Sequence, residues 1–262
     1  LKELSEAKKE LKNMLLNQKF GNASRKVVVE EFLDGIELSC FVITDGKSYK
    51  TLPMAKDYKR IGEGDVGLNT GGMGAVSPVP FVTEAFKKKI ENQIIKPTIS
   101  GLQKDGLPYK GFIFIGLIKV GDEPKVIEYN VRMGDPETEV VLPRLKTDLV
   151  EIFNAIANER LDEINVKFDS RVATTVMLVS GGYPEAYDKG KEIMGLENLK
   201  GVVPFHAGAR RFEDKVVTSG GRVMAITSLA NTHDEALNKA YQNINKICFE
   251  KMYYRKDIGF DL

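Results

Sequence analysis

The sequence predicts an α+β fold: an antiparallel sheet with flanking helices, followed by a small α+β lobe at the carboxy-terminal end. Apolar stretches of strand length are joined by tight turns such as Asp45-Gly46 and Gly121-Asp122-Glu123-Pro124, and short turns join antiparallel strands. Stretches with helical spacing lie between and after them. The composition changes near Leu161-Asp162-Glu163. We therefore predict one domain over residues 1–160 and a lobe over residues 161–262.

The individual elements follow from hydrophobic periodicity and from turn residues. We expect helices at residues 3–17, 83–102 (bent near Pro97), 138–160 and 233–248. We expect strands at residues 26–33, 37–44, 48–52, 111–120, 126–132, 172–179, 202–206, 216–217 and 222–227. The strand at 111–120 is apolar throughout, which is typical of a strand buried on both faces.

Composition restricts the class of protein. The 262 residues include 38 basic and 37 acidic side chains, a formal net charge of +1, so no basic excess indicates nucleic-acid binding. The two cysteines, Cys40 and Cys248, are far apart and fit buried thiols better than a disulfide framework or a zinc site. No apolar run has the length of a membrane span, and nothing at the start has the pattern of a signal peptide. We expect a soluble, cytoplasmic protein.

One strand carries the most informative polar pattern. Along the predicted strand 126–132, Glu128, Asn130 and Arg132 occupy alternate positions and should therefore share one face. Carboxylate and amide oxygens suit a hard divalent cation, and a neighbouring guanidinium can bind an anion bidentately. A solvated face of an ordinary amphipathic strand would show the same alternation, and the three residues alone do not exclude it.

Two further segments favour a ligand site. Gly134-Asp135-Pro136-Glu137-Thr138 gathers polar groups directly after this strand, where binding residues often lie. Residues 69–75 read Asn-Thr-Gly-Gly-Met-Gly-Ala, and their glycines allow successive backbone amides to converge on an anion as a nest. The spacing fits neither a Walker A loop nor a Rossmann fingerprint, and a flexible loop is the alternative.

The Glu-x-Asn-x-Arg strand followed by Met-Gly-Asp-Pro-Glu-Thr resembles the ATP-grasp superfamily, and within it the phosphoribosylamine–glycine ligase (glycinamide ribonucleotide synthetase) family. The resemblance runs in family order from about Val27 to Gly259. It also includes the segments Glu30–Gly35, Asp57–Arg60, Asn69–Ala75, Phe205–Gly208 and Arg255–Gly259. It implies that residues 1–160 form part of an ATP-grasp domain. It also implies that the chain corresponds to the carboxy-terminal portion of a longer ligase, without the amino-terminal domain and the nucleotide-covering lid.

The resemblance also implies roles for particular residues. The metal ligands would be Glu128 and Asn130, holding Mg²⁺ or Mn²⁺, and the catalytic residues would be Arg132 and Asp135. The ATP-binding residues would be Glu30, Glu31, Phe32 and Leu33, which would line the adenine, Glu37, which would accept the ribose hydroxyls, and Lys59. Substrates would be bound by Asn69, Thr70, Gly71, Gly72, Met73 and Gly74, together with Asp135.

The implied reaction joins glycine to 5-phosphoribosylamine with ATP, through a glycyl phosphate, in purine synthesis. Two alternatives remain: another ATP-grasp ligase acting on a different carboxylate, and a non-catalytic nucleotide-binding module that needs a partner chain. We predict that residues 1–262 alone bind ATP weakly and turn over negligibly, because the lid lysines and most phosphoribosylamine contacts would be supplied by the missing amino-terminal part. Conversion of ATP, glycine and phosphoribosylamine at an ordinary enzymatic rate by the purified chain would contradict this prediction.

Overall fold

The computed structural model describes residues 3–262, and the chain divides into two compact units, Leu1–Asp34 and Gly35–Leu262. The first unit contains the predicted helix α1 (Leu4–Asn17) and a 3₁₀ helix η1 (Gly21–Arg25). Residues 26–34 have no regular secondary structure, so the strand predicted over residues 26–33 is wrong. The β-branched residues fit a strand, but a strand also needs a partner for its backbone N–H and C=O groups, and no described strand pairs with this segment.

The larger unit contains a four-stranded antiparallel sheet in the order β2-β1-β7-β8. Its strands are β1 (Ile36–Thr44), β2 (Tyr49–Thr51), β7 (Gly111–Val120) and β8 (Glu123–Asn130). The predicted strands 37–44, 48–52 and 111–120 are confirmed. β7 is buried on both faces because helices pack against each side of the sheet. The strand predicted at 126–132 begins earlier and ends at Asn130, so Arg132 lies beyond it.

A second antiparallel sheet has five strands in the order β10-β13-β9-β6-β3. Its strands are β3 (Lys56–Asp57), β6 (Gly74–Ser77), β9 (Val172–Val179), β10 (Val203–His206) and β13 (Arg222–Ala230). Two separate hairpins are formed by β4 (Arg60–Gly62) with β5 (Val66–Asn69), and by β11 (Ala209–Phe212) with β12 (Lys215–Thr218). The five-stranded sheet combines β3 and β6, which precede residue 160, with β9, β10 and β13, which follow it. The division into domains at residues 1–160 and 161–262 remains a prediction.

Helices cover both sheets. They are α2 (Glu84–Ile90), the π-helical η2 (Glu91–Ile95), α3 (Lys96–Lys104), α4 (Thr138–Val141), α5 (Leu149–Ala157) and α6 (His233–Ile244), with 3₁₀ helices η3 (Leu142–Arg144), η4 (Leu161–Glu163) and η5 (Leu196–Asn198). The single long helix predicted over residues 138–160 is wrong. Pro143 lacks the N–H that an α-helix needs, and Asp148 caps a new helix by accepting from the Val150 N–H at 2.7 Å.

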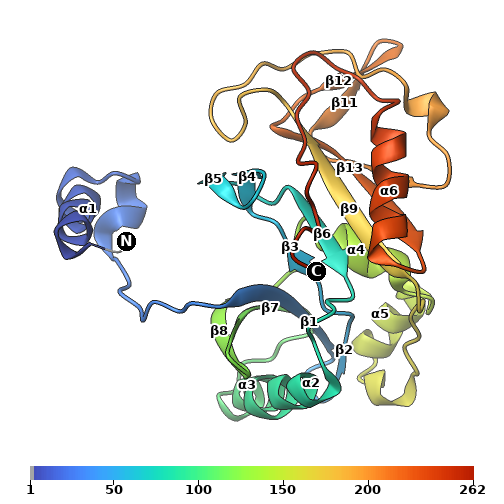
Figure 1. Cartoon of the computed structure of the whole chain (residues 1–262). Helices are drawn as coiled ribbons and strands as arrows, with labels where there is room; N and C mark the ends of the chain where they lie inside the picture. The colour runs from blue at the N-terminus through green and yellow to red at the C-terminus, as the bar shows by residue number, and fades with distance from the viewer. Residues whose placement is uncertain (1–2) are drawn as a thin grey trace. The chain divides into compact units, whose positions relative to one another are not determined.

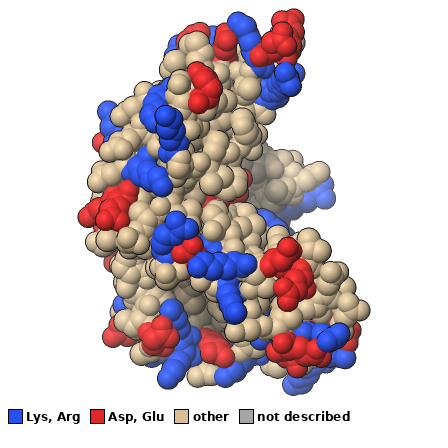
Figure 2. All heavy atoms as spheres, turned by 90° about the vertical axis from the view of Figure 1, so that its right-hand side faces the viewer, with Lys and Arg blue, Asp and Glu red and all other residues tan. Residues whose placement is uncertain are grey.

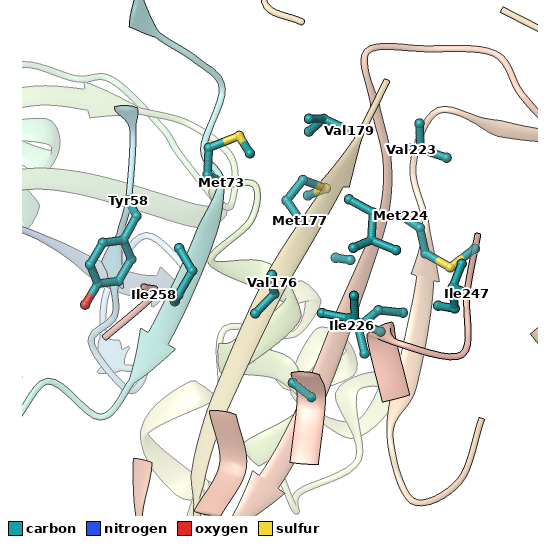
Figure 3. Packing of buried hydrophobic residues seen from close by; sticks show 14 of the residues in the cluster. Tyr58, Met73, Val176, Met177, Val179, Val223, Met224, Ile226, Ile247 and Ile258 are labelled. Carbon is teal, nitrogen blue, oxygen red and sulfur yellow. The ribbon is translucent and has the colours of Figure 1, made fainter. Parts of the chain in front are cut away.

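Three apolar clusters hold the larger unit together. One face of the four-stranded sheet, with Leu38 and Ile115, packs against α2, η2 and α3, and the opposite face, with Phe41 and Phe114, packs against α4 and α5 (Figure 1). The five-stranded sheet packs against α6. Figure 3 shows this third cluster, with Tyr58, Met73 and Ile258 toward one side of β9 and Val223, Met224 and Ile247 toward the other.

The charged surface is mixed. Lys and Arg side chains alternate with Asp and Glu over the face seen in Figure 2, in keeping with the net charge of +1. Within residues 3–262, no helix has both the length and the apolar character needed to cross a bilayer.

Arg255 is the largest fully buried side chain of the larger unit. Its guanidinium pairs with Asp257 at 2.8 Å and with Asp65 at 2.5 Å, which ties the carboxy-terminal segment to the β4–β5 hairpin. We expect Arg255→Met to lower the free energy of unfolding by about 3 kcal/mol, because it leaves carboxylates without their partner. Urea unfolding measures this loss, with the exposed Arg210→Met as the control. Equal losses in the two variants would contradict the prediction.

Candidate functional site

The strand register gathers polar side chains on one face of the four-stranded sheet. Gly116 of β7 lies opposite Ser39 of β1 on one side and opposite Glu128 of β8 on the other. In the next row, Phe114 lies between Phe41 and Asn130. Side chains directly opposite each other share a face, so Glu128 and Asn130 project toward the side that carries Ser39. The Glu128 side chain lies across Gly116, because a Cβ added there would come within 3.1 Å of Glu128 Cγ.

A β-bulge in β8 decides which face Glu128 occupies. Leu117 pairs with Val126, but Gly116 pairs with Glu128, so Ile127 is an extra residue. Val126 packs on the face that α2, η2 and α3 cover, and in a regular strand Glu128 would follow it there. The bulge re-aims the strand. Beyond it, Tyr129 faces the helices, with its hydroxyl 3.0 Å from Thr98 Oγ1 of α3.

The predicted trio lies on one side of the sheet edge. Asn130 Nδ2 donates to Glu128 Oε1 at 3.0 Å. Arg132 lies past the end of β8, where its Nη1 donates to the Met133 carbonyl at 3.0 Å and its Cζ is 5.8 Å from the centre of the Phe114 ring. Phe114 is also the residue opposite Asn130. The bend after β8 therefore brings Arg132 near Glu128 and Asn130. The predicted reason, alternation along a single strand, does not apply to Arg132.

Glu128 and Asn130 are suitable ligands for a hard cation. Asn130 uses its amide nitrogen in the bond to Glu128, so its carbonyl oxygen remains available together with the carboxylate. Within residues 3–262, no cluster of three or more His, Cys, Asp or Glu residues could hold a metal. Two protein oxygens leave most positions to water or phosphate, which suits Mg²⁺ bound with a nucleotide.

A cluster of opposite charges lies beside this row. Lys59 Nζ contacts the Glu37 carboxylate and is 3.1 Å from Asp57 Oδ1. Burial lowers the pKa of Lys59, but attraction to Asp57 and Glu37 outweighs it and raises the pKa overall. These three residues and Asn69 line one cavity of about 300 Å³. The structure thus brings together two residues predicted to bind ATP, Glu37 and Lys59, and one predicted to bind substrate.

Glu137 connects the sheet to the turn after β8. It is buried, and its Oε1 accepts a hydrogen bond from Ser39 Oγ at 2.7 Å. Burial and then repulsion from Asp57 raise the pKa of Glu137 from 4.5 to about 7. Its carboxylate lies over Gly134, where an added Cβ would be 2.5 Å from Oε2. A side chain at position 134 would therefore displace Glu137.

The glycine-rich loop packs against the same turn. Gly72 has a φ of 115°, and a Cβ there would lie 2.3 Å from Pro136 Cδ. The predicted nest of free amides is not present in this structure, because the backbone N–H groups from residue 70 to residue 73 all donate to protein acceptors. These are Lys59 O for Thr70, Tyr183 OH for Gly71, Thr70 Oγ1 for Gly72 and Tyr58 O for Met73, at 2.7–3.0 Å.

Asp135 is held by a residue that sequence reasoning missed. Arg222 Nη1 is 2.9 Å from Asp135 Oδ1 and also donates to the carbonyls of Asp135 and Gly71. Arg222 is 87 positions from Asp135, and no linear pattern links them. Glu137 and Asp57 lie inside recognised motifs and could have been found there. Ser39 and Tyr183 lie outside every motif that the sequence analysis recognised, so nothing in the sequence indicated them.

The predicted adenine segment, Glu30 to Leu33, belongs to the amino-terminal unit and has no regular secondary structure, and its residues are exposed except Leu33, which is half-buried. Its role stays a prediction.

Antiparallel sheets flanked by helices, with a carboxylate–amide pair on an edge strand, agree with the ATP-grasp class to which the first family match assigns the chain. Residues 1–138 match the family model for the phosphoribosylglycinamide synthetase ATP-grasp (A) domain, and residues 173–261 match that for the C domain. The first match covers more than half of the chain. The chain belongs to the phosphoribosylglycinamide synthetase family, as the sequence resemblance predicted.

Relatives and solved structures agree with this assignment. The chain is 50% identical over 257 residues to a bifunctional purine biosynthetic protein of Pichia angusta, covering 97% of the chain and 33% of that protein. It is 46% identical over 243 residues to the phosphoribosylamine–glycine ligase of Chlorobaculum tepidum, covering 92% of the chain and 57% of that enzyme. The chain thus spans less than two thirds of the length of each of these two relatives.

The crystal structure of the phosphoribosylamine–glycine ligase of Thermotoga maritima superimposes with a TM-score of 0.76 at 39% identity, covering 87% of this chain and 56% of that one. The biotin carboxylase subunit of a pyruvate carboxylase superimposes with a TM-score of 0.58 at 17% identity, covering 85% and 48%. The second likeness shows the shared fold alone.

The raised pKa of Glu137 makes stability depend on pH. The folded state binds this proton more tightly than the unfolded state, so stability falls as the pH rises from about 4.5 to about 7. Glu137→Gln should remove up to about 3 kcal/mol of this fall. Urea unfolding at several pH values measures it, with the exposed Glu84→Gln as the control. If Glu137→Gln keeps the wild-type slope, Glu137 is not the group responsible.

Proposed function

We propose that this chain takes part in the ATP-dependent joining of glycine to 5-phosphoribosylamine, which gives glycinamide ribonucleotide, ADP and phosphate. The observation that carries the proposal is the grouping of Glu128, Asn130 and Arg132 on one side of the edge of the four-stranded sheet, in a chain of this family. The names of the Chlorobaculum tepidum and Thermotoga maritima relatives support the choice of substrates.

The metal site of this proposal consists of Glu128 and Asn130. Their oxygens would hold Mg²⁺ or Mn²⁺, and phosphate oxygens of ATP would fill the remaining positions. The bound ion would neutralise phosphate charge that otherwise repels the incoming carboxylate.

The proposed reaction has two steps. A carboxylate oxygen of glycine bonds to the γ-phosphorus of ATP and the bond to ADP breaks, which makes glycyl phosphate. The amine of phosphoribosylamine then bonds to the acyl carbon, phosphate leaves, and the amine loses a proton. Arg132 would stabilise the negative charge on the transferring phosphoryl group and on the tetrahedral intermediate.

Each of the predicted ATP-binding residues would have its own role. Glu30 to Leu33 would line the adenine, and Glu37 would accept hydrogen bonds from the ribose hydroxyls. Lys59 would bind the phosphates. In the structure Lys59 is paired with Glu37 and Asp57, so the phosphates would compete with these carboxylates for the ammonium group.

Asp135 and the loop from Asn69 to Gly74 would position glycine and the amine. The backbone amides of Thr70, Gly71, Gly72 and Met73 are engaged within the protein. The loop would therefore act through its shape, its side chains and its carbonyl groups. Holding reactants in the right geometry lowers the barrier without any covalent role for the protein.

Binding of a metal–nucleotide complex tests the metal site in the chain as it stands. Mn²⁺ with ATP, followed by electron paramagnetic resonance, should show binding that Glu128→Gln weakens about tenfold or more. Glu123→Gln on the same strand is the control, because Glu123 is exposed and pairs with Lys89. Equal affinity in the two variants would exclude Glu128 as a ligand.

Substrate identity needs turnover. The part of the Chlorobaculum tepidum ligase that this chain does not match would be supplied in trans, and phosphate release would be followed with phosphoribosylamine and a carboxylate. We expect release with glycine and little with alanine or acetate. Equal release with all three would favour a different carboxylate ligase, and metal–nucleotide binding without phosphate release from any of them would favour a non-catalytic nucleotide-binding module.

A further inference from the structure

Arg222 joins the two segments to which the proposed function assigns the amino acid. Its Nη1 donates to the Gly71 carbonyl at 2.6 Å and to the Asp135 carbonyl at 2.9 Å, and it is 2.9 Å from Asp135 Oδ1. Gly71 lies in the loop between β5 and β6, whereas Asp135 lies in the turn after β8. One guanidinium therefore fixes the distance between two segments that are 64 positions apart (135 minus 71).

The fit around this guanidinium is close. A Cβ on Gly71 would lie 2.9 Å from Arg222 Cζ. Only 21% of the Arg222 side chain is exposed. All the contacts to Gly71 and Asp135 are made by the one nitrogen Nη1, so a cationic nitrogen at this point is what the fit requires.

The backbone at Arg222 is built to direct this side chain. The pairing of β13 with β9 shifts between Arg222 and Met224, which marks a β-bulge, and bulges re-aim side chains. Immediately after Arg222, Val223 and Met224 are fully buried in the cluster shown in Figure 3. Arg222 is thus anchored by a packed strand.

Tyr183 supplies a second anchor from the same part of the chain. Its hydroxyl accepts a hydrogen bond from the Gly71 N–H at 3.0 Å. Its ring packs against the backbone of Gly221, where an added Cβ would lie 2.2 Å from Cδ2. Both backbone groups of Gly71 are therefore bound by residues that follow β9.

We propose that Arg222, with Tyr183, is a positioning residue through which the part of the chain after residue 160 sets the binding of the amino acid substrate. Arg222 acts through Gly71 and Asp135 and leaves the nucleotide and metal residues unchanged. The choice of the amino acid as the affected substrate rests on the proposed function, whereas the fixing of the loop does not.

Hydrogen exchange on the chain as it exists tests whether the loop is held. Arg222→Gln should speed exchange of the Gly71 and Met73 amides about tenfold, because the charged hydrogen bonds to the loop are lost. Tyr183→Phe should speed exchange at Gly71 alone. Arg210→Gln on the exposed hairpin is the matched control, and urea unfolding checks that the variants fold equally well. Unchanged exchange in well-folded Arg222→Gln would overturn the proposal.

Kinetics in the reconstituted mixture test which substrate is affected. Arg222→Gln should raise KM for glycine about tenfold while KM for ATP stays near the wild-type value. Arg222→Lys should restore part of the loss, since one ammonium nitrogen can donate to Gly71 and Asp135 as Nη1 does. Equal increases in both KM values, or no rescue by lysine, would refute the positioning role. If the wild-type mixture is inactive, the proposed function fails, and hydrogen exchange still decides whether Arg222 holds the loop.

Discussion

One extra residue in β8 determines the chemistry of the sheet face. Alternation along a strand has a period of two, so a shift of one residue exchanges the two faces. Ile127 supplies that shift. Val126, before it, packs on the face covered by α2, η2 and α3, whereas Glu128, after it, lies on the opposite face. Without the bulge, the carboxylate would face an apolar layer, where an unpaired charge is costly. The candidate metal site depends on this local irregularity.

Polar contacts that range from buried to exposed hold the charged side chains around the site. Ser39 binds Glu137, and Lys59 lies between Glu37 and Asp57. Burial and then repulsion from Asp57 raise the pKa of Glu137 to about 7, so this carboxyl group is partly protonated near neutral pH.

The two halves of the chain share one sheet. β6 follows the glycine-rich loop directly and pairs with β9, and β13 lies on the other side of β9 (Figure 1). The loop is thus attached at its end to strands from the carboxy-terminal part, and Arg222 and Tyr183 hold its middle. In the proposed function, the part of the chain after residue 160 would thereby fix the backbone on which the proposed substrate residues lie.

The sequence by itself determined the elements and groupings that depend on near neighbours. The strands at 37–44 and 111–120 follow from local apolar patterns, and the closeness of Glu128 and Asn130 follows from their spacing of two residues. Pro143 interrupts the helix predicted at 138–160, which a stricter use of the same local rules would have shown. Only the tertiary structure decided the bulge at Ile127, the burial of Glu137 and the attachment of Asp135 to Arg222. These features depend on which distant segments meet in the fold. Arg222 and Asp135 are 87 positions apart, and no periodic pattern in the sequence indicates a hydrogen bond over that separation.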